Sequence, residues 1–164
     1  SLLEFLECER DSILRRDREA VQRMVIDSLR VKQAYVEADP TESRGIRDAL
    51  NLGHTFAHAL ESVGNLSRWS HGEAVAWGMV RALRAGVALG FTPSHLADRY
   101  EQLVASYGFD TSYQVEDTSR FLDALRHDKK KRDSHIRFVL MERQGSHILA
   151  TLENSLVISL VKGE

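Results

Sequence analysis

The sequence predicts a mainly α-helical fold, a helical bundle that ends in a small C-terminal β-hairpin. Apolar residues recur at intervals of three and four over most of the chain, which is the spacing of amphipathic helices. Alternation of apolar and polar residues is found only near the C-terminus, on either side of a polar turn. A length of 164 residues with 43% hydrophobic content suits one domain, residues 1–164, with a core of its own.

The first third of the chain is expected to form two helical segments and a polar loop. Residues 1–14 read as one helical piece, and a longer helix begins near Asp17. Lys32 lies on this second helix, and its spacing alone indicates a solvated lysine, as most lysines are. Residues 39–45 (DPTESRG) form a loop, because Pro40 disfavours helix at Asp39 and Gly45 relaxes the backbone.

Two helices are expected in the central stretch, residues 47–78. The first runs over residues 47–63, with Gly64 as a left-handed end. Gly53 inside it costs about 1 kcal/mol relative to alanine, which indicates a close approach by backbone or ligand. The second helix begins at His71 and is rich in Ala and Gly, a composition typical of a helix buried between others.

The C-terminal part continues with two more helices and a hairpin. Thr92 is the expected cap, and Pro93 the expected first-turn residue, of a helix over residues 93–108. Another helix, residues 118–128, ends in a basic run that the helix dipole favours. Residues 134–141 and 146–153 form the two strands of the hairpin, and Asn154 caps a final apolar segment.

Composition excludes several classes of function. A net charge of −2 leaves no basic excess for binding nucleic acid. No apolar run is long enough for a membrane span, so we expect no membrane partner. The single Cys8 excludes an internal disulfide and a cysteine-rich zinc site, which fits a cytoplasmic location.

Three of the seven histidines lie in the central stretch and make it the candidate site. His54 and His58 are four residues apart, so both project from one helical face. His71 opens the next helix, where the helix dipole favours a neutral imidazole that can ligate a metal. With Glu61 and Glu73, these side chains suit zinc or a similar divalent ion.

The spacing leaves the division of roles open. A catalytic zinc normally takes three protein ligands and keeps one position free. The three histidines could complete such a site, or one could act as acid, base or anion contact while a carboxylate comes from elsewhere. Thr55 stands where metalloprotease helices carry glutamate, which argues against a peptidase. A non-catalytic helical interaction module with packed histidines is the alternative.

At these residues the chain resembles the 3-dehydroquinate synthase family, and specifically its helical C-terminal domain. The segments LNLGHTFAHALE and SHGEAVAWGM are similar to the paired histidine motifs of that family, with Ala57 where the family usually has glycine. The likeness extends to VKQAYVEADPTESRGIR upstream and LRHDKKKRD downstream, and so covers essentially the whole chain. The family belongs with other sugar-phosphate cyclases.

The resemblance implies a role for each matching residue. His54 and His71 would hold zinc, or another divalent metal such as cobalt, while His58 would contact the phosphate side of the substrate and transfer protons. Lys32 and Arg47 would bind the substrate carboxylate, and Asn51 and Lys129 would contact the substrate phosphate. Glu42 would be a further catalytic carboxylate, in a loop one residue longer than is usual in the family. One helix face would present Arg47, Asn51, His54 and His58 in order.

The family reaction converts 3-deoxy-arabino-heptulosonate 7-phosphate to 3-dehydroquinate and phosphate, a lyase step of the shikimate pathway toward aromatic amino acids. By resemblance, NAD carries the hydride and zinc polarises substrate oxygens. The third zinc ligand, a glutamate, and the NAD-binding N-terminal domain of the family precede this region. We therefore expect the chain to be an inactive C-terminal half of a homodimeric enzyme. Another sugar-phosphate cyclase is the alternative within the class.

Overall fold

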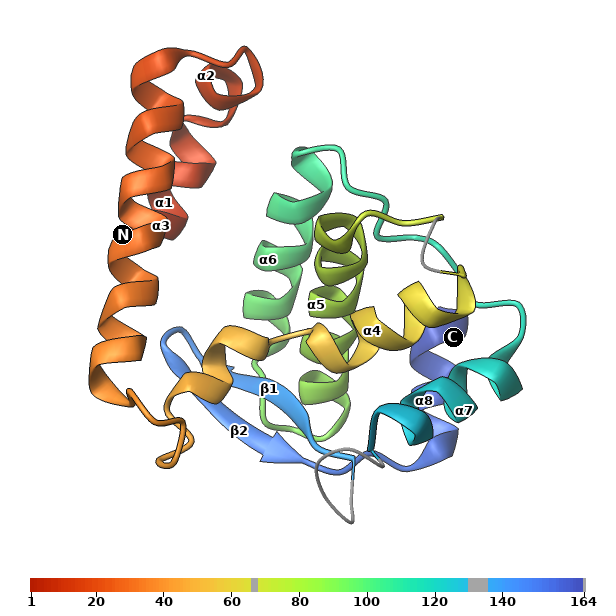
Figure 1. The fold of residues 1–164 in the computed structure, drawn as a ribbon. Coiled ribbons are helices and arrows are strands. Elements are labelled where there is room, and N and C mark those ends of the chain that lie inside the picture. The colour runs from red at the N-terminus through yellow and green to blue at the C-terminus, as the bar shows by residue number, and fades with distance from the viewer. Residues whose placement is uncertain (66–67, 130–135, 164) are drawn as a thin grey trace. The chain divides into compact units, whose positions relative to one another are not determined.

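The computed structural model describes residues 1–65, 68–129 and 136–163, apart from the side chains of residues 128 and 129. Within these residues the chain is mainly helical and carries one small antiparallel hairpin near the C-terminus (Figure 1). This confirms the predicted fold class. None of the described helices has the length and apolar character needed to cross a membrane. The chain divides into two compact units, Ser1–Leu50 and Asn51–Glu164, and the single domain stays a prediction.

Unit 1, residues 1–50, consists of three helices and the loop that follows them. α1 (Leu2–Cys8), α2 (Arg10–Leu14) and α3 (Arg18–Ala38) all contact one another. The Asp17 carboxylate accepts a hydrogen bond from the backbone N–H of Ala20 at 3.0 Å, so α3 begins where the sequence predicted. The helices share a small apolar core made of Leu3, Phe5, Ile13 and Ala20.

The predicted continuous helix over residues 47–63 is wrong. The structure has a short 3-10 helix, η1 (Arg47–Asn51), and then α4 (His54–Val63). Gly53 separates them with φ of +83°, in the left-handed region that favours glycine. Arg47 and Asn51 therefore do not share a helix face with the histidines. The predicted left-handed end at Gly64 is also wrong, since its φ is −79°.

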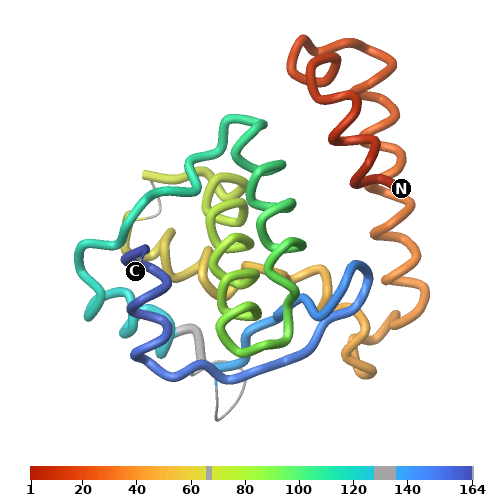
Figure 2. Tube along the Cα trace, turned by 180° about the vertical axis from the view of Figure 1, so that it is seen from behind, coloured from red at the N-terminus to blue at the C-terminus, as the bar shows by residue number. Residues whose placement is uncertain are grey.

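Unit 2, residues 51–164, is built around α5 (His71–Ala88). This helix contacts α4, α6 (Ser94–Ser106), the first strand and α8 (Asn154–Lys162), while α4 also contacts α7 (Thr118–Lys129). Figures 1 and 2 show α5 and α6 side by side, with α4 crossing α5. The predicted burial of this helix is confirmed, and the aromatic residues of the surrounding core are Phe56, Trp77, Phe121 and Phe138.

The hairpin closes one side of this core. β1 (Phe138–Arg143) pairs antiparallel with β2 (Ser146–Ala150), with Phe138 opposite Ala150. The connecting turn contains Gly145 with φ of +79°, which a glycine adopts without strain. The predicted hairpin is therefore confirmed, and Phe138 and Leu140 bring it into contact with the helical core.

Two predicted helix caps are wrong. Thr92 is buried, and its hydroxyl donates to the carbonyl of Met141 on β1, so it ties the start of α6 to the hairpin. The N-cap of α6 is Pro93, which has no side chain able to accept a hydrogen bond. At α8 the N-cap is Glu153 and not Asn154, which is the first residue of the helix.

Candidate functional site

The three histidines of the central stretch come together in unit 2. His54 opens α4, His58 follows one turn later, and His71 opens α5. The ring centroids are 5.5 Å apart for His54 and His71, 5.8 Å for His54 and His58, and 6.2 Å for His58 and His71. Two imidazoles that share one tetrahedral zinc, at Zn–N of about 2.0–2.1 Å, hold their centroids about 5 Å apart. The separation of His54 and His71 is the nearest to that value.

Contact between two glycines brings α4 and α5 this close together. A Cβ on Gly53 would lie 2.4 Å from the backbone nitrogen of Met79, and one on Gly78 would lie 2.3 Å from the Gly53 carbonyl oxygen. Neither position can carry a side chain without separating the helices. The close approach predicted for Gly53 is thus confirmed, with backbone as the neighbour. It fixes the residue that follows, His54, against α5.

The surroundings of His54 favour a neutral imidazole. Burial lowers the pKa of His54, and the neighbouring imidazoles of His58 and His71 lower it further, although the backbone at Leu52 acts in the opposite direction. Its Nδ1 is buried and has no hydrogen-bond partner among the described residues. A neutral ring with an unused nitrogen has the state that metal ligation requires.

His71 is held by a carboxylate. Its Nδ1 lies 3.1 Å from Oε1 of Glu61, whose side chain is 16% exposed. A carboxylate on one ring nitrogen fixes the tautomer and leaves the other nitrogen available to an ion. Glu61, which the sequence offered as a possible ligand, therefore contacts a histidine. The chemistry of this pair suits a metal ligand and its supporting carboxylate.

Glu73 has a different function. Its carboxylate accepts from the backbone N–H of Ser70 at 2.8 Å and from the Ser70 hydroxyl at 2.6 Å, while the Ser70 hydroxyl accepts from the Glu73 N–H. These hydrogen bonds lower the pKa of Glu73. The arrangement is a capping box that starts α5. Glu73 thus fixes the helix end that presents His71.

The histidines alone do not complete a metal site. No group of three or more His, Cys, Asp or Glu side chains in residues 1–65, 68–129 and 136–163 is arranged to hold an ion. Within these residues, His54 and His71 are the pair of imidazoles whose separation suits a shared ion. Asn51 is exposed at the end of η1. The side chain of Lys129, at the end of α7, lies outside the described residues.

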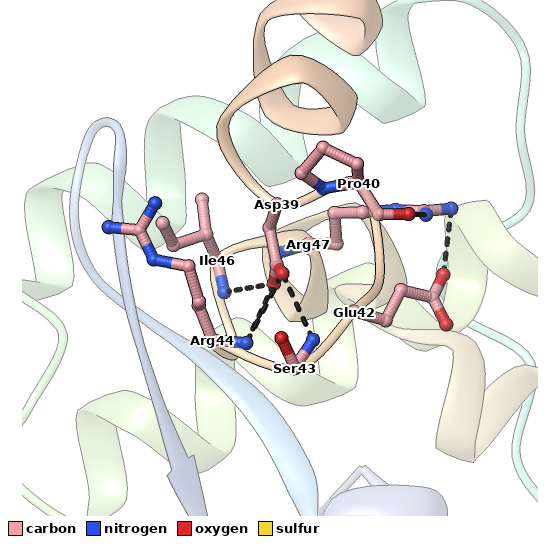
Figure 3. Close-up of polar contacts among 7 residues, drawn as sticks. All are labelled: Asp39, Pro40, Glu42, Ser43, Arg44, Ile46 and Arg47. Atoms are coloured by element: carbon pink, nitrogen blue, oxygen red, sulfur yellow. Dashed lines mark hydrogen bonds and ion pairs between the residues drawn. The ribbon is translucent and has the colours of Figure 1, made fainter.

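The remaining predicted residues belong to unit 1. Lys32 is exposed on α3. Glu42 and Arg47 form an ion pair, with 2.7 Å between Oε1 of Glu42 and Nη2 of Arg47 (Figure 3). Nη1 of Arg47 also donates to the carbonyl of Pro40 at 3.4 Å, whereas its Nε is buried and has no partner within the described part of the chain. The planar guanidinium is therefore held in one orientation with a donor unused.

The structure adds Asp39, which the sequence pattern indicates only as a helix end. Its side chain is fully buried and accepts hydrogen bonds from backbone N–H groups of the loop that carries Glu42 and Arg47 (Figure 3). Burial raises the pKa of Asp39, but these backbone donors outweigh it, and the net pKa lies below its ordinary value. An aspartate before proline at a helix end is a sequence signal for such a turn.

Comparison with known proteins places this chain in a family. The 3-dehydroquinate synthase C-terminal family model matches residues 1–131. The 3-dehydroquinate synthase of Dehalococcoides mccartyi strain CBDB1 is 40% identical over 149 residues, which cover 91% of this chain and 41% of the relative. That of Halorhodospira halophila is 38% identical, over 91% of this chain and 42% of the relative. The chain spans less than half the length of these relatives.

Solved structures share the fold. The 2-epi-5-epi-valiolone synthase ValA from Streptomyces hygroscopicus, with NAD+ and Zn2+ bound, superposes with a TM-score of 0.80 at 17% identity, over 99% of this chain and 47% of that one. A 2-deoxy-scyllo-inosose synthase complexed with carbaglucose-6-phosphate, NAD+ and Co2+ gives a TM-score of 0.59 at 23% identity, over 69% and 34%. With the family model matching residues 1–131, the chain belongs to the 3-dehydroquinate synthase C-terminal domain family.

Proposed function

We propose that this chain is the helical half of a 3-dehydroquinate synthase, which converts 3-deoxy-arabino-heptulosonate 7-phosphate to 3-dehydroquinate and phosphate. The observation that carries the proposal is the meeting of His54, His58 and His71, within 6.2 Å between ring centroids, inside the histidine motifs. The relatives named 3-dehydroquinate synthase support the same reaction.

His54 and His71 are the proposed zinc ligands of this chain. The unused Nδ1 of His54 and the carboxylate on Nδ1 of His71 fit that role, and cobalt would suit the same nitrogen donors. When bound, the ion supplies Lewis-acid polarisation of substrate oxygens. The third ligand, a glutamate, and the NAD-binding domain would be provided by protein outside this chain, and the complete enzyme would be a homodimer.

His58 is the proposed proton carrier. It lies one turn beyond His54 on α4 and is exposed, unlike the partly buried His54. Imidazole is the side chain that most often accepts and returns a proton in enzyme catalysis. We assign it to the phosphate side of the substrate, where it would hold the proton that leaves as phosphate is eliminated. Asn51 and Lys129 are the proposed phosphate contacts.

Arg47 and Lys32 are the proposed clamp for the substrate carboxylate. A guanidinium forms paired, planar hydrogen bonds with a carboxylate, and Arg47 is already held in place by Glu42 and the Pro40 carbonyl. Glu42 is proposed as a further active-site carboxylate. A cyclase for a neutral ketose phosphate would have no use for this clamp, which is why we favour the sugar-acid substrate over that of another sugar-phosphate cyclase.

The test is a substrate comparison on the complete protein that contains this chain. Purified enzyme with NAD and zinc is assayed separately with 3-deoxy-arabino-heptulosonate 7-phosphate and with sedoheptulose 7-phosphate, and phosphate release is measured. We expect turnover of the first only. Turnover of sedoheptulose 7-phosphate alone would identify another cyclase. Release of phosphate from neither substrate would favour a non-catalytic helical module.

A further inference from the structure

Asp39 organises the loop that follows α3. Its Oδ1 accepts from the backbone N–H of Ser43 at 3.0 Å and of Arg44 at 3.2 Å. Its Oδ2 accepts from those of Ile46 at 3.1 Å and Arg47 at 3.5 Å. Four N–H groups spread over five residues thus converge on one carboxylate (Figure 3). The loop is closed around this side chain.

Closing the loop brings Glu42 and Arg47 together. The two residues are five positions apart, and their side chains meet at 2.7 Å. Glu42 has φ of +54°, a conformation that a non-glycine residue adopts only where the surrounding structure imposes it. The interactions that impose it are the Asp39 hydrogen bonds to three residues between Glu42 and Arg47 and to Arg47 itself.

The chemistry of the site requires a carboxylate. Ionised aspartate is only an acceptor, so both of its oxygens can face N–H groups. An asparagine would keep one acceptor and turn its NH2 group toward backbone donors, which cannot accept from it. Asp39→Asn therefore removes about half of the loop's anchoring with almost no change in side-chain volume.

We infer that Asp39 is a positioning residue, which acts through the loop backbone to hold Glu42 and Arg47 as a preformed pair facing the carboxylate of the substrate. The part of this inference in which Glu42 and Arg47 face the substrate rests on the proposed function. The part in which Asp39 holds the loop rests on the loop geometry alone. Asp39 is fully buried, so its proposed effect passes through the backbone and not through contact with substrate.

The first experiment compares Asp39→Asn with a matched control in the complete enzyme. Asp27→Asn is the control, because Asp27 lies on α3 in surface ion pairs with Arg23 and Arg30 and makes none of the loop contacts. We expect kcat/KM of Asp39→Asn to fall by about tenfold or more, since small misplacements of binding groups are costly. Zinc content should be unchanged, and Asp27→Asn should stay within about twofold of wild type.

A double-mutant cycle with Arg47→Lys distinguishes an effect of Asp39 on the position of Arg47 from a general loss of protein stability. If Asp39 acts through Arg47, Asp39→Asn should raise KM much less in the Arg47→Lys enzyme than in the wild type, because coupled residues are not additive. Equal increases in both backgrounds would overturn the inference. So would wild-type kcat/KM in Asp39→Asn.

Amide hydrogen exchange tests the geometry without any assay of activity. In Asp39→Asn the amides of Ser43, Arg44 and Ile46 should exchange about tenfold faster or more, while amides of α3 keep their protection. Unchanged exchange at these three amides would overturn the positioning role. The two proposals can fail separately. If these amides exchange faster in Asp39→Asn but the wild-type enzyme does not turn over 3-deoxy-arabino-heptulosonate 7-phosphate, the role of Asp39 in the loop is supported and the proposed function is rejected.

Discussion

At the scale of single residues, the three histidines differ in what surrounds them. His54 is partly buried with an unused Nδ1, and His71 has its Nδ1 against Glu61. His58 is exposed on the same helix as His54. These differences support the proposed roles of two metal ligands and one proton carrier. Sequence spacing alone paired His54 with His58 and could not distinguish the roles, because burial and hydrogen bonding come from the packing of α4 on α5.

The division of roles predicts different metal contents for three alanine variants. In the complete enzyme, His54→Ala and His71→Ala should each lose zinc, because a ligand is removed. His58→Ala should keep zinc and lose turnover by about a hundredfold or more, the contribution typical of a general acid or base. Elemental analysis after gel filtration, with phosphate release on the same samples, measures both. Equal loss of zinc in all three variants would contradict the assignment.

Glu61 predicts an effect on metal affinity without being a ligand. Glu61→Gln keeps a hydrogen-bonding side chain beside His71 but removes its charge, and zinc affinity should fall by about 10- to 100-fold. Competition with a chromophoric chelator measures this. Glu73→Gln is the control, because Glu73 lies on α5 near His71 but bonds to Ser70. A similar loss of affinity in both variants would point to the helix end and not to the Glu61–His71 contact.

Asp39 predicts a dependence of stability on pH. Its pKa is lower in the folded protein than the unperturbed value of 3.8, so the unfolded state binds more protons in the interval between the two values. The stabilisation that ionised Asp39 gives the folded protein is therefore complete above the unperturbed pKa, and it is lost as the pH falls through the pKa of the folded state. Denaturant unfolding at a series of acidic pH values should show a shallower acid loss for Asp39→Asn. Parallel pH profiles for wild type and variant would refute this.

At the scale of helices and strands, hydrophobic spacing predicted most of the architecture. The hairpin, the buried α5 and the start of α3 at Asp17 all follow from local patterns. The break at Gly53 did not, because the residues on both sides suit a helix. Only the contact with α5, which is distant in sequence, shows why the chain turns there. The burial of Thr92 against β1 escaped prediction for the same reason.

The glycine contact between α4 and α5 predicts a large difference between two glycine-to-alanine variants. Gly53→Ala places a Cβ 2.4 Å from the Met79 nitrogen at φ of +83°, and should cost about 2–5 kcal/mol through overpacking and backbone strain. Gly72 lies in α5 with nothing near its Cβ position, so Gly72→Ala should be neutral or stabilise by up to about 1 kcal/mol. Urea unfolding compares them. Similar urea midpoints for Gly53→Ala and Gly72→Ala would show that α4 and α5 can move apart without loss of stability.

At the scale of the whole molecule, the motifs predicted the family but not how the chain divides. The division into units at residue 50 falls inside the stretch that the sequence treated as one helix. Family membership is shown by a match over residues 1–131, whereas the chain covers 41% of the D. mccartyi relative. We propose that the remainder of such a protein supplies the third zinc ligand and the NAD-binding domain. The resemblance to the family implied both features, whereas the histidine spacing left a site of three histidines open.

The proposed set of two histidine ligands predicts how the 164-residue chain behaves by itself. The two proposed histidine ligands are one fewer than a catalytic zinc site normally takes. No set of three ligands is arranged to hold an ion within residues 1–65, 68–129 and 136–163. The isolated chain should therefore bind zinc much more weakly than the complete protein and show no phosphate release. Zinc titration by calorimetry and the same assay on both proteins test this. Turnover by the isolated chain would show that its own residues complete the site, and would reject the proposed dependence on an external glutamate and NAD-binding domain.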